Sequence, residues 1–494
     1  MIENPKSLLP FLHFDEADSW ARLLELCTGF LNADGLDRLQ ALLSGTVRTV
    51  AVEYHYIDRD YRDTFSGFHS KKFSTPASRC IRLHFFRERI EHGRVRAIDE
   101  AVRAAYVGYA VIRPTRPNCM GRTLLDPTRI AGVSGALCRC SEKVSLQGAE
   151  LTVTGFPFIS QDGDATVCAE SATWMVLRYF SNRYPSYREI HPFQITTATQ
   201  HHAVGKRVYP SNGLQLWQMA ETLRREGFAP MTYSRTGLPE SAEFTDLLYT
   251  YIESGFPVFA ALKGHVVVAL GHRSDYGKAL PVDQVWIKSS YFNEAFVIND
   301  DNRFPYQLVE RVPPSDRVPL VSIHGLDDIA AFTVPLPEKV FLSAEAFASL
   351  VRQFVLESDF SVKNQSPLLA GRPLLTRHFL TTCKSFKQHL GTRGMGNPLV
   401  REIYHNLPLP HFIWICEITT PDLYQAGAQK VLGEIIWDAT RNAYEPLGFI
   451  AAHYPEKLWV DTGSAFNQPP KFERWELADS ASYPVLKSNL LELP

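Results

Sequence analysis

The chain has 494 residues, of which 45% are hydrophobic and 21% are charged, and its formal net charge is −2. This composition is typical of a globular protein, and a charge near zero gives no global field that would recruit nucleic acid or an anionic membrane. No stretch approaches about 18 uninterrupted apolar residues, and the N-terminus has no basic region before an apolar run. We therefore expect no membrane span, no signal peptide and a cytoplasmic location. The length predicts about two to four domains.

Residues 1–150 combine helical and strand patterns. The segments "ADSWARLLELC" and "GLDRLQALLSG" have helical spacing of apolar residues, and Gly45 supplies a helix stop. The segments "TVRTVAVEYHYI", "CIRLHFF" and "VGYAVIRP" are rich in β-branched and aromatic residues, which predicts strands. We expect an N-terminal α+β domain of unknown role.

Two further domains are expected after residue 150. Residues 151–312 show a helix-rich half followed by a strand-rich half, and "VPPSDRVP" at 312–319 has the composition of a linker. Residues 320–494 then combine a helical segment, "SAEAFASLVRQFVLE", with three strand-like segments, "PHFIWICEIT", "VLGEIIWDAT" and "PLGFIAAHYP". These features predict a C-terminal α+β domain that binds a partner or substrate.

Cys168 stands where a polar, turn-prone run gives way to a helical pattern. The apolar positions Ala172, Met175, Val176 and Tyr179 follow it at helical spacing, so we expect Cys168 in the first turn of a largely buried helix. A thiol there meets the positive end of the helix dipole, which favours the thiolate. Free cysteines are more often inert core residues, so this segment alone does not establish a nucleophile.

Downstream residues supply the other groups that thiol chemistry needs. The segment "LLYTYIESGFPVFAALKGHVVVALGHR" predicts a helix, a strand, a tight turn and a second strand that begins at His265. The segment "EAFVINDDNRFPY" predicts a strand that ends at Asp300 and Asp301. A nucleophile, a base and a residue that orients the base are the three roles of acyl transfer.

The order and local patterns of these segments resemble the papain-like cysteine peptidase superfamily, and within it the C39-like peptidases. The matching residues are Gln161, Cys168, "GFPV" at 255–258, "GHVVV" at 264–268 and "IND" at 298–300. The resemblance covers about residues 155–310. It implies an α+β, papain-like central domain with a helical nucleophile half and an antiparallel β half.

The resemblance implies a role for each matching residue. Cys168 would be the nucleophile, His265 the general base and acid, and Asp300 the residue that holds the imidazole. Gln161, seven positions before Cys168, would stabilise the oxyanion together with the backbone N–H of Cys168. The sequence is nearly as compatible with the alternative that Gln161 is an ordinary surface residue of a loop.

Other histidines, cysteines and an aspartate lie near these segments in the sequence. Strand alternation predicts that His272 faces away from His265 and that Asp301 points elsewhere than Asp300. His201 and His202 have no carboxylates at suitable offsets, and the pair Cys138 and Cys140 has no second ligand pair, so we expect no metal site. Trp217 is expected in a helix core, with a cleft wall as the alternative.

These observations favour a cytosolic cysteine peptidase that acts on a peptide or isopeptide bond of a protein or peptide substrate, without metal or organic cofactor. By analogy with C39-like peptidases, cleavage after Gly-Gly is one specialisation. Two alternatives stay open. The same residues could transfer an acyl group to an amine, or the chain could be a binding or sensor protein in which Glu170, two residues after Cys168, obstructs the cleft.

Overall fold

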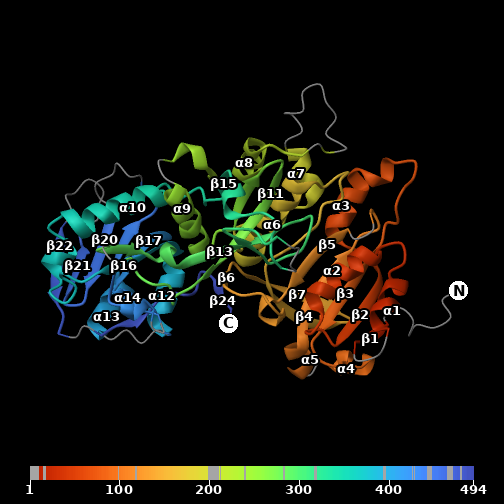
Figure 1. Cartoon of the computed structure of the whole chain (residues 1–494), viewed down its shortest axis with the longest axis horizontal. Helices are drawn as coiled ribbons and strands as arrows, with labels where there is room; N and C mark the ends of the chain where they lie inside the picture. Colours follow the sequence, from red (N-terminus) through yellow and green to blue (C-terminus); the bar gives the residue numbers. More distant parts are fainter. Residues whose placement is uncertain are drawn as a thin grey trace.

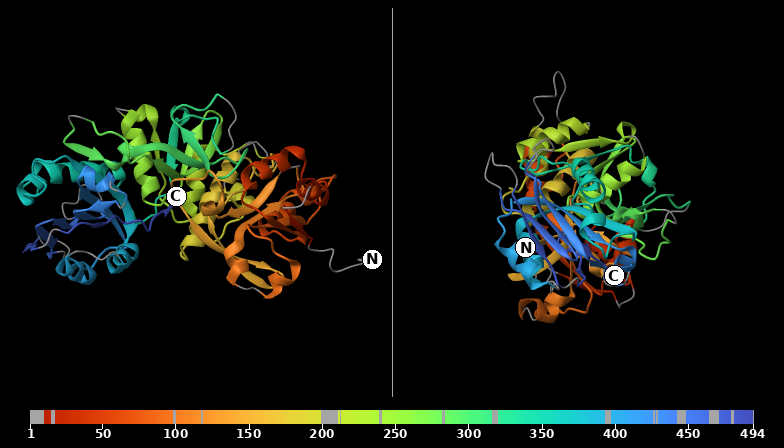
Figure 2. Two further views of the ribbon diagram at one scale, coloured as in Figure 1. Left: turned by 60° about the horizontal axis from the view of Figure 1, so that its bottom comes forward. Right: turned by 90° about the vertical axis from the view of Figure 1, so that its left-hand side faces the viewer.

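The chain folds into three parts that follow one another along the long axis of the molecule, as both Figure 1 and Figure 2 show. The N-terminal, central and C-terminal parts each contain a sheet with helices packed on it, so the structure is a mixed α+β protein as predicted. The computed structural model describes residues 10–14, 18–97, 100–116, 119–198, 211, 213–238, 241–281, 284–315, 320–392, 397–425, 427, 429–441, 448–463, 471–478 and 481–493.

The N-terminal part is built on a five-stranded antiparallel sheet in the order β1-β2-β3-β4-β5. One face packs on α1 and α2, and the other packs on the hairpin of β7 and β8. Burial on both faces explains why the strand segments run apolar without alternation. The elements are β1 (Phe11–His13), α1 (Ser19–Leu26), α2 (Ala33–Leu43), β2 (Thr49–Tyr56), α3 (Arg59–Gly67), β3 (Cys80–Phe86), α4 (His92–Ala97), α5 (Glu100–Ala105), β4 (Tyr106–Ile112), β5 (Met120–Leu125), β7 (Cys140–Leu146) and β8 (Ala149–Gly155).

The central sheet has the strand order β14-β13-β11-β10-β15-β9; in addition, β6 pairs with β11, and β24 pairs with β6. The long helix α6 packs against β11, and its residues 169–180 are all buried. The elements are β6 (Ala136–Leu137), α6 (Cys168–Arg183), α7 (Pro192–Ala198), α8 (Leu216–Arg225), β9 (Met231–Ser234), α9 (Ser241–Glu253), β10 (Val258–Leu262), β11 (His265–Ser274), β13 (Asn293–Asn299), β14 (Gln307–Glu310), β15 (Ala331–Val334) and β24 (Leu491–Glu492).

The C-terminal part holds a seven-stranded sheet in the order β12-β16-β17-β19-β20-β21-β22, in which the three predicted strand segments are β17, β19 and β20. The predicted helical segment is α10, which continues as a π-helical turn at Gln353–Glu357. The elements are β12 (Trp286–Lys288), α10 (Ala344–Arg352), α11 (Val362–Gln365), β16 (Leu374–Thr382), α12 (Cys383–Thr392), α13 (Pro398–Asn406), β17 (Phe412–Thr419), α14 (Pro421–Gln425), β18 (Lys430–Val431), β19 (Gly433–Asp438), β20 (Phe449–Tyr454), β21 (Lys457–Asp461), β22 (Phe472–Glu476) and β23 (Tyr483–Pro484).

Strands cross the limits that the sequence suggests for the domains. β6 precedes residue 151 and β15 follows the proline-rich segment at 312–319, yet both belong to the central sheet. In the opposite sense, β12 lies in the middle of the chain and pairs in parallel with β16 of the C-terminal sheet. The end of the chain returns to the central part through β24 (Figure 1). The central and C-terminal sheets therefore each contain strands from more than one predicted domain, and the chain does not divide at the two predicted boundaries.

A buried ion-pair network joins the central and C-terminal parts. Arg377 of β16 contacts Glu253 at the end of α9 (Nε to Oε1, 2.6 Å) and Glu417 of β17 (Nη1 to Oε2, 2.7 Å). All three side chains are buried, so removal of one would leave an uncompensated charge in the interior. This network fixes how the two parts pack.

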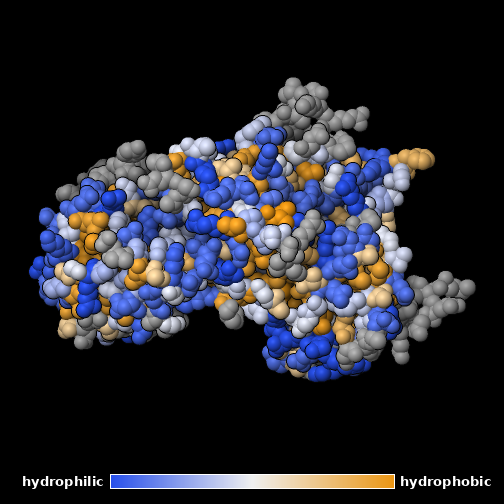
Figure 3. All heavy atoms as spheres, viewed as in Figure 1, coloured by the Kyte–Doolittle hydropathy of each residue, from blue (hydrophilic) through white to orange (hydrophobic). Residues whose placement is uncertain are grey.

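The molecular surface in the view of Figure 3 is a mixture of hydrophilic and hydrophobic side chains, with the hydrophobic ones in separate small areas. Within the described part of the chain, none of the helices combines the length and the apolar character needed to cross a bilayer.

Candidate active site

Cys168 is the first residue of α6, as the sequence predicts. The residue before it, Val167, has extended backbone angles (φ −111°, ψ −174°), so the helix begins abruptly at the thiol. Cys168 is partly exposed, although the residues that follow it in the helix are buried. Of the other seven cysteines, only Cys383 is also partly exposed. The thiol therefore sits at the open, positive end of a buried helix dipole.

The loop before α6 is shaped by Asp162. Its Oδ1 atom accepts hydrogen bonds from the backbone N–H groups of residues 164, 165 and 166, at 2.9, 2.8 and 2.8 Å. Burial alone raises the pKa of this carboxyl, but the interaction with the nearby His69, the charge of Arg113 and the backbone donors outweigh burial and hold the pKa well below its usual range. An ionised Asp162 thus fixes the turn that presents Cys168.

His265 is placed by a β-hairpin. It opens β11 and pairs with Leu262, the last residue of β10, across a two-residue turn in which Gly264 has φ +71°. β13 runs antiparallel to β11 with Val268 opposite Asn299. In that register the residues after Asn299 continue toward the first residues of β11. Asp300 is therefore brought beside His265, as predicted.

The side chain of His265 contacts both predicted partners. Its Nε2 atom lies 3.0 Å from Oδ1 of Asp300, and the Cys168 side chain is close enough to the ring to influence its pKa. Burial is the largest single influence and lowers the pKa of His265, but the hydrogen bond to Asp300, the neighbouring Cys168 side chain and the carboxylate charges together raise the pKa to about 10. The pKa of Asp300 is lowered, because the bond to His265 and the imidazolium charge outweigh burial. At neutral pH the pair is an imidazolium and a carboxylate.

Asp301 does not point away from the site, so the prediction from alternation is wrong. Its Oδ1 atom lies 3.7 Å from Nε2 of His265, and the side chain is buried. The strand ends at Asn299, so the two aspartates lie in a turn where alternation no longer applies. Burial, reinforced by the charge of Asp300 and opposed by that of His265, raises the pKa of Asp301 to about 7.

Gln161 lies next to these residues through Asn302. Its Nε2 atom donates to Oδ1 of Asn302, and Nδ2 of Asn302 is 3.4 Å from Nε2 of His265. The backbone N–H of Asn302 also donates to Oδ1 of Asp300 at 3.0 Å. The Gln161 side chain is partly exposed, which leaves it accessible to a ligand. Asn302 was not identified from the sequence.

Glu170 does not obstruct the site. The side chain is fully buried, and Oε1 accepts a hydrogen bond of 2.5 Å from the hydroxyl of Ser211. Burial raises the pKa of Glu170 above its ordinary value. Its position two residues along α6 from Cys168 directs the side chain to another face of the helix. The alternative in which Glu170 obstructs the cleft is therefore not supported by its buried position.

The remaining residues considered in the sequence have other environments. His272 faces away from His265, as predicted, and its Nε2 atom lies 2.5 Å from Oε2 of Glu253. Trp217 is 55% exposed, so its prediction as a core residue is wrong. Cys138 and Cys140 are free, and burial raises the pKa of each thiol to about 12. His201 and His202 lie outside the described residues.

Two groups of described side chains have the spacing of metal ligands. One is His265 with Asp300 and Asp301, and the other is Asp60 with Glu189 and His191. In the second group the carboxylates already contact guanidinium groups, since Arg122 Nη2 lies 2.9 Å from Asp60 and 2.8 Å from Glu189. A guanidinium group that is paired with a carboxylate repels a metal ion, so it reduces the affinity of that carboxylate for the metal. This group is therefore an ion-pair network between α3, β5 and the segment before α7.

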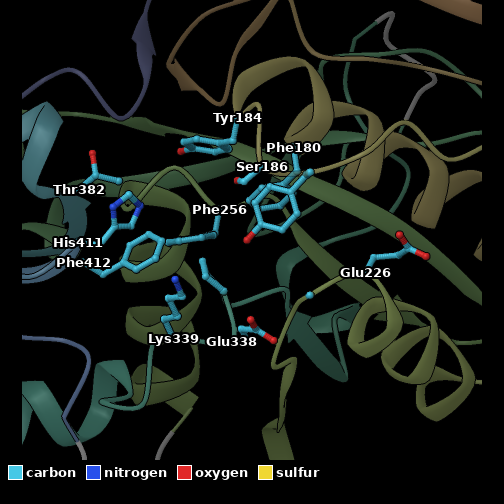
Figure 4. A pocket seen from close by; sticks show the side chains of 13 residues that line it. Phe180, Tyr184, Ser186, Glu226, Phe256, Glu338, Lys339, Thr382, His411 and Phe412 are labelled. Atoms are coloured by element: carbon cyan, nitrogen blue, oxygen red, sulfur yellow. The ribbon is translucent and has the colours of Figure 1, made fainter.

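An open pocket of about 490 Å³ lies beside His265. We call it the His265 pocket, and its lining includes Asp34, Arg38, His265, Arg303, Ile323 and His324. A second pocket, of about 350 Å³, is drawn in Figure 4 and is walled by the aromatic rings of Phe180, Tyr184, Phe256 and Phe412. Phe180 is twelve residues along α6 from Cys168, about 18 Å at the helical rise. The second pocket thus lies far from the thiol.

Comparison of the chain with models of known protein families, with curated proteins and with solved structures finds no match.

Proposed function

We propose that this protein is a papain-like cysteine peptidase, and that Cys168, His265 and Asp300 are its catalytic residues. The observation that carries the proposal is the position of His265, whose ring contacts the Cys168 side chain and, through Nε2, the carboxylate of Asp300. Nucleophile, base and orienting carboxylate in mutual contact are the arrangement that thiol-based acyl transfer requires.

In this proposal the reaction begins from an imidazolium beside a negatively charged sulfur. His265 and the N-terminus of α6 both stabilise negative charge on Cys168. The sulfur attacks the substrate carbonyl carbon, the carbonyl π electrons move to oxygen, and the oxyanion accepts hydrogen bonds from the backbone N–H of Cys168 and from Gln161. Collapse of this intermediate breaks the C–N bond, and His265 gives its proton to the leaving amine.

The second half of the reaction releases the acyl group. His265, now neutral, removes a proton from water, and the hydroxide oxygen attacks the thioester carbon. The C–S bond breaks, and sulfur again carries the negative charge beside the imidazolium. Asp300 keeps Nε2 of the ring engaged throughout, which leaves Nδ1 as the nitrogen available for these proton transfers. An amine in place of water would give acyl transfer instead of hydrolysis.

All eight cysteines are free, which supports action in a reducing compartment such as the cytoplasm. The open pocket beside His265 supports a peptide or protein segment as the substrate, because His265 and Asp300 both line it.

The proposal is tested by incubating the protein with a library of peptides of random sequence and detecting new termini by mass spectrometry. We expect cleavage by the unaltered protein and by Cys383→Ala, and none by Cys168→Ala. Cys383 is a matched control, because it also opens a helix and is partly exposed. Added hydroxylamine traps the thioester intermediate that hydrolysis and transfer share, so hydroxamates report acylation of the enzyme. Equal cleavage by Cys168→Ala would refute the proposal, as would no cleavage and no hydroxamate from the unaltered protein.

A further inference from the structure

The His265 pocket is assembled from segments that lie far apart in the sequence. α2 of the N-terminal part contributes Asp34 and Arg38, and the turn after β13 contributes Arg303. Arg38 is anchored to that turn, since its Nη1 atom donates to the backbone carbonyl of Asn302 at 3.1 Å. The N-terminal part is thus a wall of the pocket next to the candidate base.

The charges of this pocket pair off, with one exception. Oδ2 of Asp34 lies 3.0 Å from Nη2 of Arg38, and Oδ1 of Asp300 lies 3.0 Å from Nε2 of His265. Each of these pairs is close to neutral as a unit. The guanidinium of Arg303 has no hydrogen bond or ion pair with any residue that the structure describes, although the side chain is half-buried. Arg303 is therefore the unmatched cation of the pocket.

The neighbours of Arg303 leave its charge uncompensated. His324 lines the same pocket, and burial, with the charges of His265 and Arg303, lowers its pKa below the ordinary value despite the opposing effect of Asp300. A neutral imidazole at physiological pH neither repels an anion strongly nor neutralises the guanidinium. Next to His324, Ile323 is 45% exposed and offers an apolar surface at the pocket.

Arg303 is also held close to the reacting groups. Its backbone N–H donates to the backbone carbonyl of Asp300 at 2.9 Å, so the turn that carries Arg303 is the turn that orients His265. A guanidinium binds a carboxylate through two parallel hydrogen bonds, and a half-buried position strengthens such a pair relative to one in bulk water. A substrate carboxylate bound there would lie near the scissile bond.

We propose that Arg303 is a specificity-determining residue, and that the substrates of this protein carry an Asp or Glu side chain close to the scissile bond. The inference rests on the proposed function, because it assigns a substrate class to the same site. Arg303 forms the ion pair with the substrate carboxylate, and Ile323 packs against an adjacent apolar substrate side chain. Since Asp34 already pairs with Arg38, the selectivity depends on Arg303.

The test uses matched pairs of short peptidyl electrophiles that alkylate cysteine, identical except for Glu or Gln at one position near the reactive group. The rate of Cys168 modification is followed by intact mass and peptide mapping. For at least one position we expect the Glu probe to react at least about 10-fold faster than the Gln probe, the lower end of the range for a hydrogen bond between charged groups. The preference should decline as salt is raised.

Arg303→Gln should reduce the ratio of the Glu-probe rate to the Gln-probe rate to about one, and Arg303→Lys should retain part of this ratio. Arg401→Gln is the matched control, because it makes the same charge change on an exposed position of α13 in the C-terminal part. A Glu preference that survives Arg303→Gln, or no Glu preference at any position, would overturn the inference while Cys168 still reacts. Failure of every probe to modify Cys168 selectively would overturn the proposed function and this inference together.

Discussion

Replacement of Asp300 by Asn should lower the pKa of His265. The carboxylate lies 3.0 Å from Nε2 of the ring, and it is the first of the influences that raise the pKa to about 10. Asn keeps the size and a hydrogen-bond acceptor but removes the charge. A carboxylate at such a distance typically raises the pKa of its partner by about 1–3 units. In Asp300→Asn we therefore expect a His265 pKa between about 7 and 9.

The same shift has consequences for stability and activity. Because the folded pKa of His265 exceeds the ordinary value of 6.5, the ring stabilises the fold fully below pH 6.5 and progressively less as pH rises toward about 10. Each unit of lost pKa shift removes about 1.4 kcal/mol of this stabilisation at pH below 6.5. The alkaline limb of kcat/KM should move to lower pH, since His265 must carry a proton for the leaving amine.

The assay is an NMR titration of ring-labelled histidines over a pH series, combined with kcat/KM over the same series. Asp327→Asn is the matched control, because Asp327 is an exposed carboxylate that contacts Arg235 and not His265. The control should leave the His265 titration unchanged. The reasoning would be refuted if His265 had the same pKa in the unaltered protein and in Asp300→Asn, because the charge of Asp300 would then not stabilise the protonated ring.

Three further predictions concern the surroundings of the thiol. Asp162→Ala removes the acceptor of three loop N–H groups and the counter-charge of buried Arg113, so urea denaturation should show a loss of about 3–5 kcal/mol; a loss under about 1 kcal/mol would contradict this. In the folded protein the pKa of Asp301 is raised to about 7, so the folded state holds the Asp301 proton more tightly than the unfolded state does. The free energy of unfolding should therefore fall as pH rises from about 4 to 7. Asp301→Asn should flatten that slope of Tm against pH, and an unchanged slope would exclude Asp301 as its cause. Glu170→Gln should keep kcat/KM within about twofold, because the side chain is buried against Ser211; a strong effect on charged substrates would show that it reaches the pocket.

The sequence predicts the parts of the site that local patterns encode. The start of α6 at Cys168, the hairpin turn before His265 and the strand that ends before Asp300 are each set by a few neighbouring residues, and their order along the chain suggested the contact. The antiparallel pairing of β11 with β13 then brings the last two together. The predicted positions of the helix start, the hairpin turn and the strand end are confirmed, because apolar periodicity and turn residues determine the backbone there.

Features that depend on the geometry of turns or on distant segments were missed. Asp301 and Asn302 follow the end of β13, where strand alternation gives no direction for a side chain. The signal for Asn302 was available in principle, because a polar residue two positions after the orienting aspartate falls in the same turn. Arg38 reaches the pocket from α2, and no local pattern in the sequence reports a contact over that separation. The sequence places Glu170 close to Cys168 along the chain, but the helix directs its side chain to the interior.

The central claim, that His265 activates Cys168, is tested most directly by the rate at which iodoacetamide alkylates individual cysteines at pH 7. Cys168 and Cys383 both open helices and are both partly exposed, so the contact with His265 is the difference that matters. We predict that Cys168 reacts at least about tenfold faster than Cys383 and that His265→Ala abolishes this difference. Equal rates for the two thiols in the unaltered protein, or a Cys168 rate unaffected by His265→Ala, would contradict the account.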